Sequence, residues 1–136
     1  MRRIYLDVNV VLDYLLRRDP WVIEAEQLIY LAESRQLQVV IYSNVLIQAY
    51  HYLQKYGAGK LAKAHLLAFS QLVELVPLTH AQLVDLLEDP SDKDIEDQMQ
   101  VSLAEANGCD CIITRDAGFA SSSIEVITPG QFLTNF

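Results

Sequence analysis

The sequence predicts an α/β fold: a three-layer α/β/α sandwich with a central, mainly parallel sheet of about five strands. Short apolar, β-branched runs alternate along the chain with stretches of helical apolar spacing, which is the pattern of βαβ units. Right-handed connections between such strands place helices on both faces of the sheet. The chain has 136 residues, of which 51% are hydrophobic, and no internal repeat or linker divides it, so we expect one domain over residues 1–136.

The strands are predicted from apolar, largely β-branched runs bounded by polar or turn-forming residues. Pro77 lies within the third run and cannot donate a ladder hydrogen bond, which predicts that this strand lies at a sheet edge. In chain order, the expected strands are Arg3–Leu6, Leu37–Ile41, Val73–Leu78, Cys109–Thr114 and Ile124–Ile127.

The helices are predicted from apolar side chains at helical spacing and from capping residues. Asp19, followed by Pro20, is expected to cap the second helix, and Thr79 and Asp94 are expected to cap two later ones. Gly108 is expected to end the helix before the fourth strand. In chain order, the helices are expected near residues 10–18, 20–32, 44–55, 60–70, 80–88 and 94–107, with a last turn from Thr128-Pro129.

The charge of the chain is unevenly distributed. The formal net charge is −8, which by itself argues against a nucleic-acid partner. Residues 85–97 hold seven acids and one lysine, however, so the remaining 11 acids and 9 basic residues leave only −2 elsewhere. Such a local excess is typical of a carboxylate metal site, and equally of a solvated acidic turn.

Nothing in the chain indicates a membrane or an oxidising compartment. There is no run of about 18 apolar residues, as a membrane span needs, and no apolar signal segment follows Met1. Cys109 and Cys111 alternate within an expected strand and are poorly placed to form a disulfide with each other. We therefore expect a cytoplasmic protein with two reduced thiols.

Four acidic residues are expected to meet at one edge of the sheet. Asp7 follows the first strand and Asp116 follows the fourth, while Asp94 and Asp97 begin the helix that leads into the fourth strand. In a doubly wound sheet these positions share the crevice at the carboxyl ends of the strands. Clustered carboxylates repel one another unless protons or a cation neutralise them. Oxygen ligands favour Mg²⁺ or Mn²⁺, which activates water and offsets charge on a phosphoryl group.

Neighbouring polar residues would support this site, and each acid also has an ordinary structural explanation. Asn9 and Thr114 are placed to orient a ligand or a water molecule. Asp7 and Asp94 could instead be helix caps, Asp97 a surface acid favoured by the helix dipole, and Asp116 a turn residue. Asp13, one helical turn after Asn9, is expected to make a loop or capping contact rather than to bind metal.

The chain resembles the PIN domain family, a metal-dependent ribonuclease fold that includes the toxins of many toxin–antitoxin pairs. Three segments carry the resemblance: Ile4–Asp13, Asp94–Gln100, and Gly108–Asp116 with the following Phe119. It implies metal-binding, catalytic acids at Asp7, Asp97 and Asp116, with Asp94 beside them. It further implies an RNA substrate, an antitoxin protein partner and a homodimer.

One position departs from the family pattern. PIN nucleases usually carry another acid in the helix after the second strand, but the helix over 44–55 has none, and Gln48 stands at the corresponding position. An amide keeps a hydrogen-bonding oxygen but supplies no charge. The alternative function is therefore a catalytically weakened module that binds RNA or a protein partner.

Basic residues outside the acidic segment are the candidates for RNA contacts. They are Arg17, Arg18, Lys55, Lys60, Lys63 and Arg115. Lys55 and Lys60 flank the expected break Gly57-Ala58-Gly59, although such lysines are more often only a solvated face. A phosphotransferase of the haloacid-dehalogenase type is disfavoured, because that chemistry needs a second aspartate where this chain has Asn9.

Overall fold

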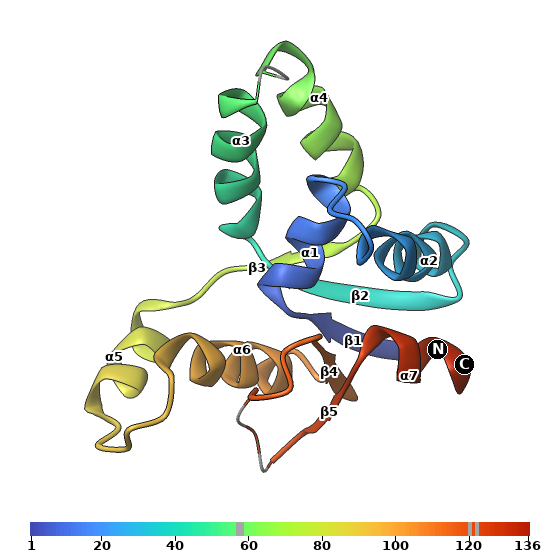
Figure 1. Ribbon diagram of the computed structural model, residues 1–136. Helices are drawn as coiled ribbons and strands as arrows, with labels where there is room; N and C mark the ends of the chain where they lie inside the picture. Colours follow the sequence, from blue (N-terminus) through green and yellow to red (C-terminus); the bar gives the residue numbers. More distant parts are fainter. Residues whose placement is uncertain (57–58, 120, 122) are drawn as a thin grey trace.

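The sheet is wholly parallel and has the strand order β3–β2–β1–β4–β5 in the computed structural model, which describes residues 1–56, 59–119, 121 and 123–136 (Figure 1). The order reverses at β1, so β1 lies between β2 and β4 and its carboxyl end faces a topological switch point. The strands are β1 (Arg2–Leu6), β2 (Leu37–Tyr42), β3 (Glu74–Val76), β4 (Cys111–Ile113) and β5 (Glu125–Ile127).

Helices cover both faces of this sheet, as the sequence predicts. Successive residues of β1 point to opposite faces: Ile4 and Leu6 pack with residues of α1, α2 and α7, whereas Tyr5 packs with residues of α5 and α6. The three-layer α/β/α prediction is confirmed. The helices are α1 (Val8–Leu15), α2 (Val22–Glu33), α3 (Val45–Lys55), α4 (Gly59–Ser70), α5 (His80–Glu88), α6 (Ile95–Ala106) and α7 (Pro129–Thr134).

Several boundary predictions are confirmed. β3 is an edge strand as predicted, although it spans only Glu74–Val76 and ends before Pro77. Thr79 caps α5 in a capping box with Gln82, and Asp94 caps α6 by accepting a hydrogen bond from the Asp97 backbone N–H. Gly108 ends the segment after α6 with a φ of 68°, a left-handed conformation that favours glycine.

The predicted start of the second helix is wrong. α2 begins at Val22, Trp21 occupies its N-cap without a side-chain hydrogen bond, and Asp19 lies before the cap. The backbone N–H of Val22 donates to the carbonyl of Arg18 at 2.8 Å, so a backbone turn satisfies this donor in place of an aspartate side chain.

The helices α3 and α4 pack against each other and extend away from the sheet as an arm (Figure 1). Of the predicted break at 57–59, residues 57 and 58 lie outside the described residues, and α4 begins at Gly59. None of the helices in the described part of the chain has the length and apolar character that a membrane crossing needs.

Candidate active site

Asp7 stands at the carboxyl end of β1, where that strand meets β4. Its backbone N–H donates to the carbonyl of Ile113 at 3.0 Å, which continues the β1–β4 ladder and sets Asp7 beside Thr114. The Asp7 side chain is only 3% exposed and caps α1. The chain therefore buries a carboxylate at the strand-to-helix junction that the sequence indicates.

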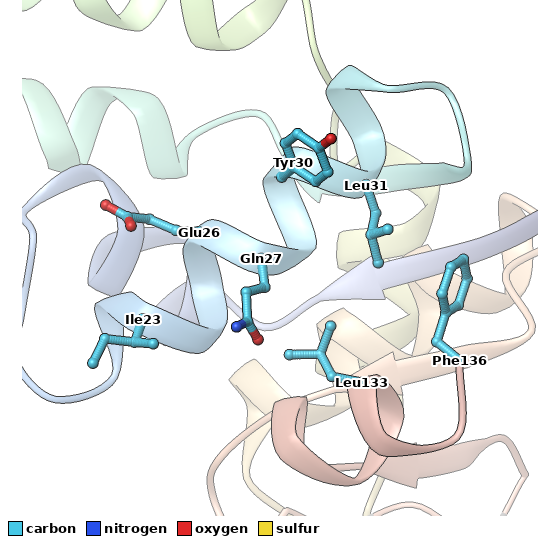
Figure 2. A pocket seen from close by; sticks show the side chains of 7 residues that line it. All are labelled: Ile23, Glu26, Gln27, Tyr30, Leu31, Leu133 and Phe136. Carbon is cyan, nitrogen blue, oxygen red and sulfur yellow. The ribbon is translucent and has the colours of Figure 1, made fainter.

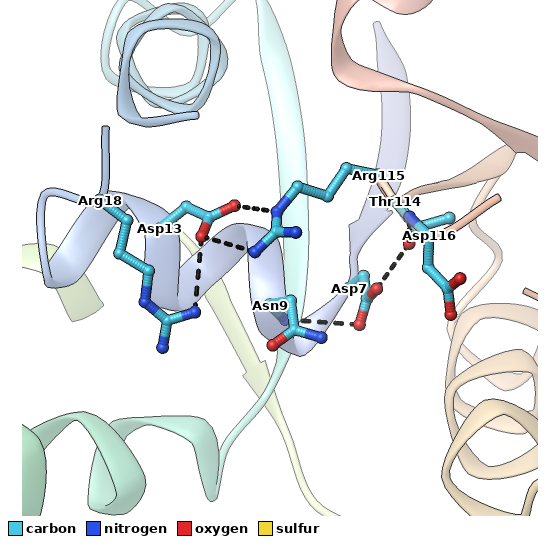
Figure 3. Close-up of polar contacts among 7 residues, drawn as sticks. All are labelled: Asp7, Asn9, Asp13, Arg18, Thr114, Arg115 and Asp116. Atoms are coloured by element: carbon cyan, nitrogen blue, oxygen red, sulfur yellow. Dashed lines mark hydrogen bonds and ion pairs between the residues drawn. The ribbon is translucent and has the colours of Figure 1, made fainter. Parts of the chain in front are cut away.

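Neutral groups hold the Asp7 carboxylate. The Thr114 hydroxyl donates to Asp7 Oδ2 at 2.6 Å, and the Asn9 backbone N–H donates to Oδ1 at 3.4 Å (Figure 3). Gln100 Nε2 also donates to Oδ1, at 3.0 Å, while Gln100 Oε1 accepts from the Val8 backbone N–H at 3.0 Å. Asp7 forms no ion pair with any other described residue. Its charge is thus stabilised by hydrogen bonds and not by a contacting cation.

Asp116 is tied to Asp7 through one shared hydroxyl. Thr114 Oγ1, which donates to Asp7, accepts a hydrogen bond from the Asp116 backbone N–H at 3.0 Å. The Gly118 backbone N–H in turn donates to Asp116 Oδ1 at 2.9 Å. The structure thus brings Asp7, Thr114 and Asp116 together.

The acids at the start of α6 and Asp7 act through their charges on the same carboxyl group, that of Glu96. Partial burial raises the pKa of Glu96, and the negative charges of Asp7, Asp94 and Asp97 raise it further. Asp97 lies three residues before Gln100, one helical turn from the amide that bonds Asp7. Asp7, Asp94 and Asp97 therefore all lie close enough to Glu96 for their charges to act on its carboxyl group, whereas Asp116 is connected to Asp7 through Thr114.

The sequence analysis missed two residues near Asp7. Glu96 belongs to the acidic segment 85–97 but is not among the predicted ligands. Gln100 is 1% exposed, and the signal that marks it is a polar residue among the buried positions Met99, Leu103 and Ala104 of α6.

Gln48 lies on α3. Together with Val8 and Glu96 it lines a hollow of about 270 Å³, whose other walls are mainly apolar side chains of α5 and α6. Val8 directly follows Asp7, so this hollow lies next to the carboxyl end of β1, although Asp7, Asp94, Asp97 and Asp116 do not line it.

Asp13 and Arg115 form a second polar cluster beside the first. Arg115 Nε donates to Asp13 Oδ2 at 2.7 Å and Nη2 donates to Oδ1 at 3.2 Å, while Arg18 Nη1 lies 3.6 Å from Oδ1 (Figure 3). The hydrogen bond to Asp13 raises the pKa of Arg115. The expectation that Asp13 supports a loop is confirmed, and Arg115, predicted to contact RNA, directs its Nε and Nη2 at this buried carboxylate.

The other predicted RNA contacts lie elsewhere. Arg17 forms an ion pair with Glu26 at 2.9 Å on the surface. Lys55 ends α3, where its ammonium lies 6.0 Å from the Tyr56 ring, and Lys60 is exposed in the first turn of α4. Lys55 is seven residues beyond Gln48, about 10 Å along the helix, toward the tip of the arm.

The donor set around Asp7 fits a hard divalent cation. All the candidate ligands are carboxylate oxygens, and Asp7 has no cationic partner among the described residues. No three His, Cys, Asp or Glu side chains within the described ranges are already arranged to enclose a metal ion. Mg²⁺ in proteins usually keeps several water ligands and uses one or two carboxylates, so the pair Asp7 and Asp116 suits it.

A different hollow, of about 540 Å³, lies between α2 and α7 (Figure 2). Its walls are mainly Ile23, Tyr30, Leu31, Leu133 and Phe136, with Glu26 and Gln27 as its polar side chains. It contains none of the acids predicted for catalysis, so its size does not make it the candidate active site.

Comparison with known proteins identifies the class to which this fold and site belong. The chain belongs to the PIN domain family, whose family model matches residues 3–118. The resemblance and the fold predicted from the sequence are thereby confirmed.

The individual relatives agree with this assignment. The chain is 28% identical over 134 residues to Ribonuclease VapC1 of Aquifex aeolicus (strain VF5), covering 96% of this chain and 92% of that protein. The crystal structure of Mycobacterium tuberculosis VapC20, a sarcin-ricin loop cleaving toxin, aligns with a TM-score of 0.61 at 16% identity over 85% of this chain and 92% of that one. VapBC2 from Rickettsia felis, bound to a DNA fragment from its promoter, aligns with a TM-score of 0.60 at 16% identity over 92% and 96%.

Proposed function

We propose that this chain is a metal-dependent endoribonuclease and the toxin of a toxin–antitoxin pair. Membership of the PIN family and similarity to a protein named as a ribonuclease support the activity. The observation that carries the proposal is the buried carboxylate of Asp7, held by neutral donors and linked through Thr114 to Asp116 at the sheet edge.

The proposed roles follow from these contacts. Asp7, Asp97 and Asp116 supply carboxylate oxygens to Mg²⁺ or Mn²⁺, and Asp94 adds negative charge while capping α6. Thr114 and Gln100 hold Asp7 in one orientation, and Asn9 lies exposed beside it. The cation, when bound, supplies an activated water and offsets the charge that develops on the phosphoryl group.

The proposal includes the partners of such a toxin. RNA is the substrate, an antitoxin protein inhibits the enzyme, and the enzyme forms a homodimer in the cytoplasm. The basic residues Arg17, Lys55 and Lys60 remain candidates for contacts to RNA phosphates, whereas the contacts of Arg115 with Asp13 favour a different role for it.

The experiment is cleavage of RNA by the purified chain with Mg²⁺ or Mn²⁺, with EDTA, and with Asp97→Asn. We expect cleavage that requires the metal and is abolished by Asp97→Asn while circular dichroism stays unchanged. Asp92→Asn is the matched control, because it removes the same charge from an exposed position of the acidic segment. Cleavage that survives both EDTA and Asp97→Asn would contradict the proposal.

A second candidate function, a weakened module that binds RNA or a protein partner, is favoured by one observation. Gln48 lines a hollow together with Val8 and Glu96 and adds no charge to it. Gln48→Glu separates the candidates: tighter Mn²⁺ binding in calorimetry, or faster cleavage, indicates a nuclease site weakened at this position. Unchanged Mn²⁺ affinity and unchanged RNA binding favour a role that does not need the metal.

A further inference from the structure

Arg115 lies between two residues of the candidate active site but directs its side chain away from it. Thr114, on one side, donates to Asp7, and Asp116, on the other, is a proposed metal ligand. The Arg115 side chain reaches instead to Asp13 on α1 (Figure 3). The segment 114–116 thus combines residues of the site with an anchor outside it.

The anchor holds the guanidinium both by its edge and by its face. Asp13 is 1% exposed and accepts two hydrogen bonds along the edge, from Nε at 2.7 Å and from Nη2 at 3.2 Å. Trp21 covers the face, with its ring centroid 4.0 Å from Arg115 Cζ. A planar guanidinium suits such paired and stacked contacts, which a lysine cannot reproduce.

Both attachment points of this segment belong to the same helix. Asp7 caps α1 and Asp13 lies on it six residues later, so Thr114 and Arg115 bind the two ends of one short helix. Two contacts separated along a rigid element fix the orientation of a segment, whereas either contact alone leaves a rotation free.

We propose that Asp13 is a positioning residue of the candidate active site. Through Arg115 it holds the segment 114–116 against α1, and this sets the carboxylate of Asp116 relative to that of Asp7. The proposal rests on the proposed function for its catalytic meaning, and it assigns Arg115 to the architecture of the site and not to RNA contacts.

The first test is Mn²⁺ affinity, measured by calorimetry without RNA. Asp13→Asn and Arg115→Lys are expected to weaken binding by roughly 10- to 100-fold, the usual effect of removing a group that orients a metal ligand. Leu66→Ala in α4 is the matched control, because it destabilises the core without touching the site. Glu26→Gln, which removes the surface ion pair of Arg17, controls for the loss of a salt bridge nearby.

The second test needs no metal. The backbone N–H of Asp116 bonds to Thr114 Oγ1 and that of Gly118 bonds to Asp116 Oδ1, so amide hydrogen exchange at these two positions reports the order of the segment. We expect faster exchange there in Asp13→Asn and Arg115→Lys than in Leu66→Ala. Trp21 is the only tryptophan of the chain, so its fluorescence reports whether the guanidinium has left the ring.

The outcomes separate this proposal from the proposed function. If the parent protein binds no Mn²⁺, the proposed function fails, and the exchange rates at 116 and 118 alone decide whether Asp13 positions the segment. If both variants change affinity and exchange no more than Leu66→Ala does, the proposal is overturned. Should Asp13→Asn fail to fold, Arg115→Lys decides, because it keeps a positive charge beside the buried carboxylate.

Discussion

Two buried carboxylates on the same short helix have opposite surroundings. Asp13 is paired with the guanidinium groups of Arg115 and Arg18, whereas the hydrogen bonds that Asp7 accepts from described residues come from an amide, a hydroxyl and a backbone N–H. Both side chains are almost completely buried, at 1% and 3% exposure. The protein therefore neutralises Asp13 by itself and leaves the charge of Asp7 to act on the crevice.

The difference distinguishes a carboxylate with ion-pair partners from one that is held by neutral donors. A buried charge is costly unless it is paired, and hydrogen bonds from neutral groups relieve only part of that cost. Asp94, Glu96 and Asp97 add further negative charge near Asp7, as the raised pKa of Glu96 indicates. The carboxylate of Asp7 thus lies among further acids without an ion-pair partner within the described residues, whereas Asp13 has two guanidinium groups beside it.

The largest expected effect comes from Asp7→Asn. We expect metal-dependent cleavage to fall by about 1,000-fold, since a bound metal contributes several kcal/mol to the transition state and each 1.36 kcal/mol is tenfold. Stability without metal should change by less than about 1 kcal/mol, because asparagine can also cap α1 and carries no charge to bury. Single-turnover cleavage and urea denaturation measure the two quantities. A large loss of stability would mean that Asp7 is structural like Asp13.

Arg115→Met, unlike Asp7→Asn, should cause a large loss of stability. It leaves Asp13 buried with only Arg18, 3.6 Å away. We expect a loss of about 3 kcal/mol, at the low end for a broken buried pair because about a third of the Arg115 side chain is exposed. Urea denaturation at neutral pH measures it, with Glu26→Gln as the surface control, for which a loss below about 1 kcal/mol is expected. If both variants lose the same stability, the Asp13–Arg115 pair contributes no more than a surface ion pair. The distinction between the surroundings of Asp13 and those of Asp7 would then fail.

The sequence analysis predicted the first of these carboxylates better than the second. Asp7 and Asp116 follow strands that neighbour each other in the sheet, and the strand-end rule of parallel sheets predicts their proximity without side-chain detail. The helix-cap explanations of Asp7 and Asp94 also hold, since both side chains cap helices. A cap and a site residue are therefore not exclusive interpretations.

The Asp13–Arg115 pair could not be predicted in the same way. The two residues are 102 positions apart in sequence, and their contact depends on the turn between α1 and α2, which places Trp21 beneath the guanidinium. That turn is the part of the fold where the predicted helix cap at Asp19 is wrong. Arg115 is one of the basic residues outside the acidic segment, so the sequence alone makes it a candidate for an RNA contact.

Thr114→Val sharpens the comparison by removing the hydroxyl that links Asp7 to Asp116. Valine has nearly the same shape but leaves Asp7 Oδ2 and the Asp116 backbone N–H without this partner. We expect a stability loss of about 1–2 kcal/mol, because Asp7 Oδ2 is buried. Mn²⁺ affinity should fall with it, whereas the stacking of Arg115 on Trp21 should persist, so Trp21 fluorescence should not change. A fluorescence change would show that the stacking of Arg115 on Trp21 depends on the Thr114 hydroxyl.

The smallest effect concerns the pH dependence of stability near Glu96. Its pKa is raised in the folded chain above the ordinary value of 4.5, by burial first and then by Asp7, Asp94 and Asp97. The folded state therefore holds more protons than the unfolded state between pH 4.5 and the raised pKa, so stability falls as the pH rises through this window. Glu96→Gln should remove that fall, a change of less than about 1 kcal/mol because the side chain is largely exposed.

Urea midpoints at pH 4.5 and pH 7 for the parent and for Glu96→Gln measure this difference. Asp92→Asn, at an exposed position of the same acidic segment, is the control and should keep the slope of the parent. Saturating Mn²⁺ should also flatten the slope of the parent, because a cation beside Asp7 offsets the repulsion that raises the pKa of Glu96. If Glu96→Gln and Asp92→Asn both keep the slope of the parent, the charge of Asp7 does not act on the acids of α6. The contrast with Asp13 then concerns only the contacts of Asp7 itself.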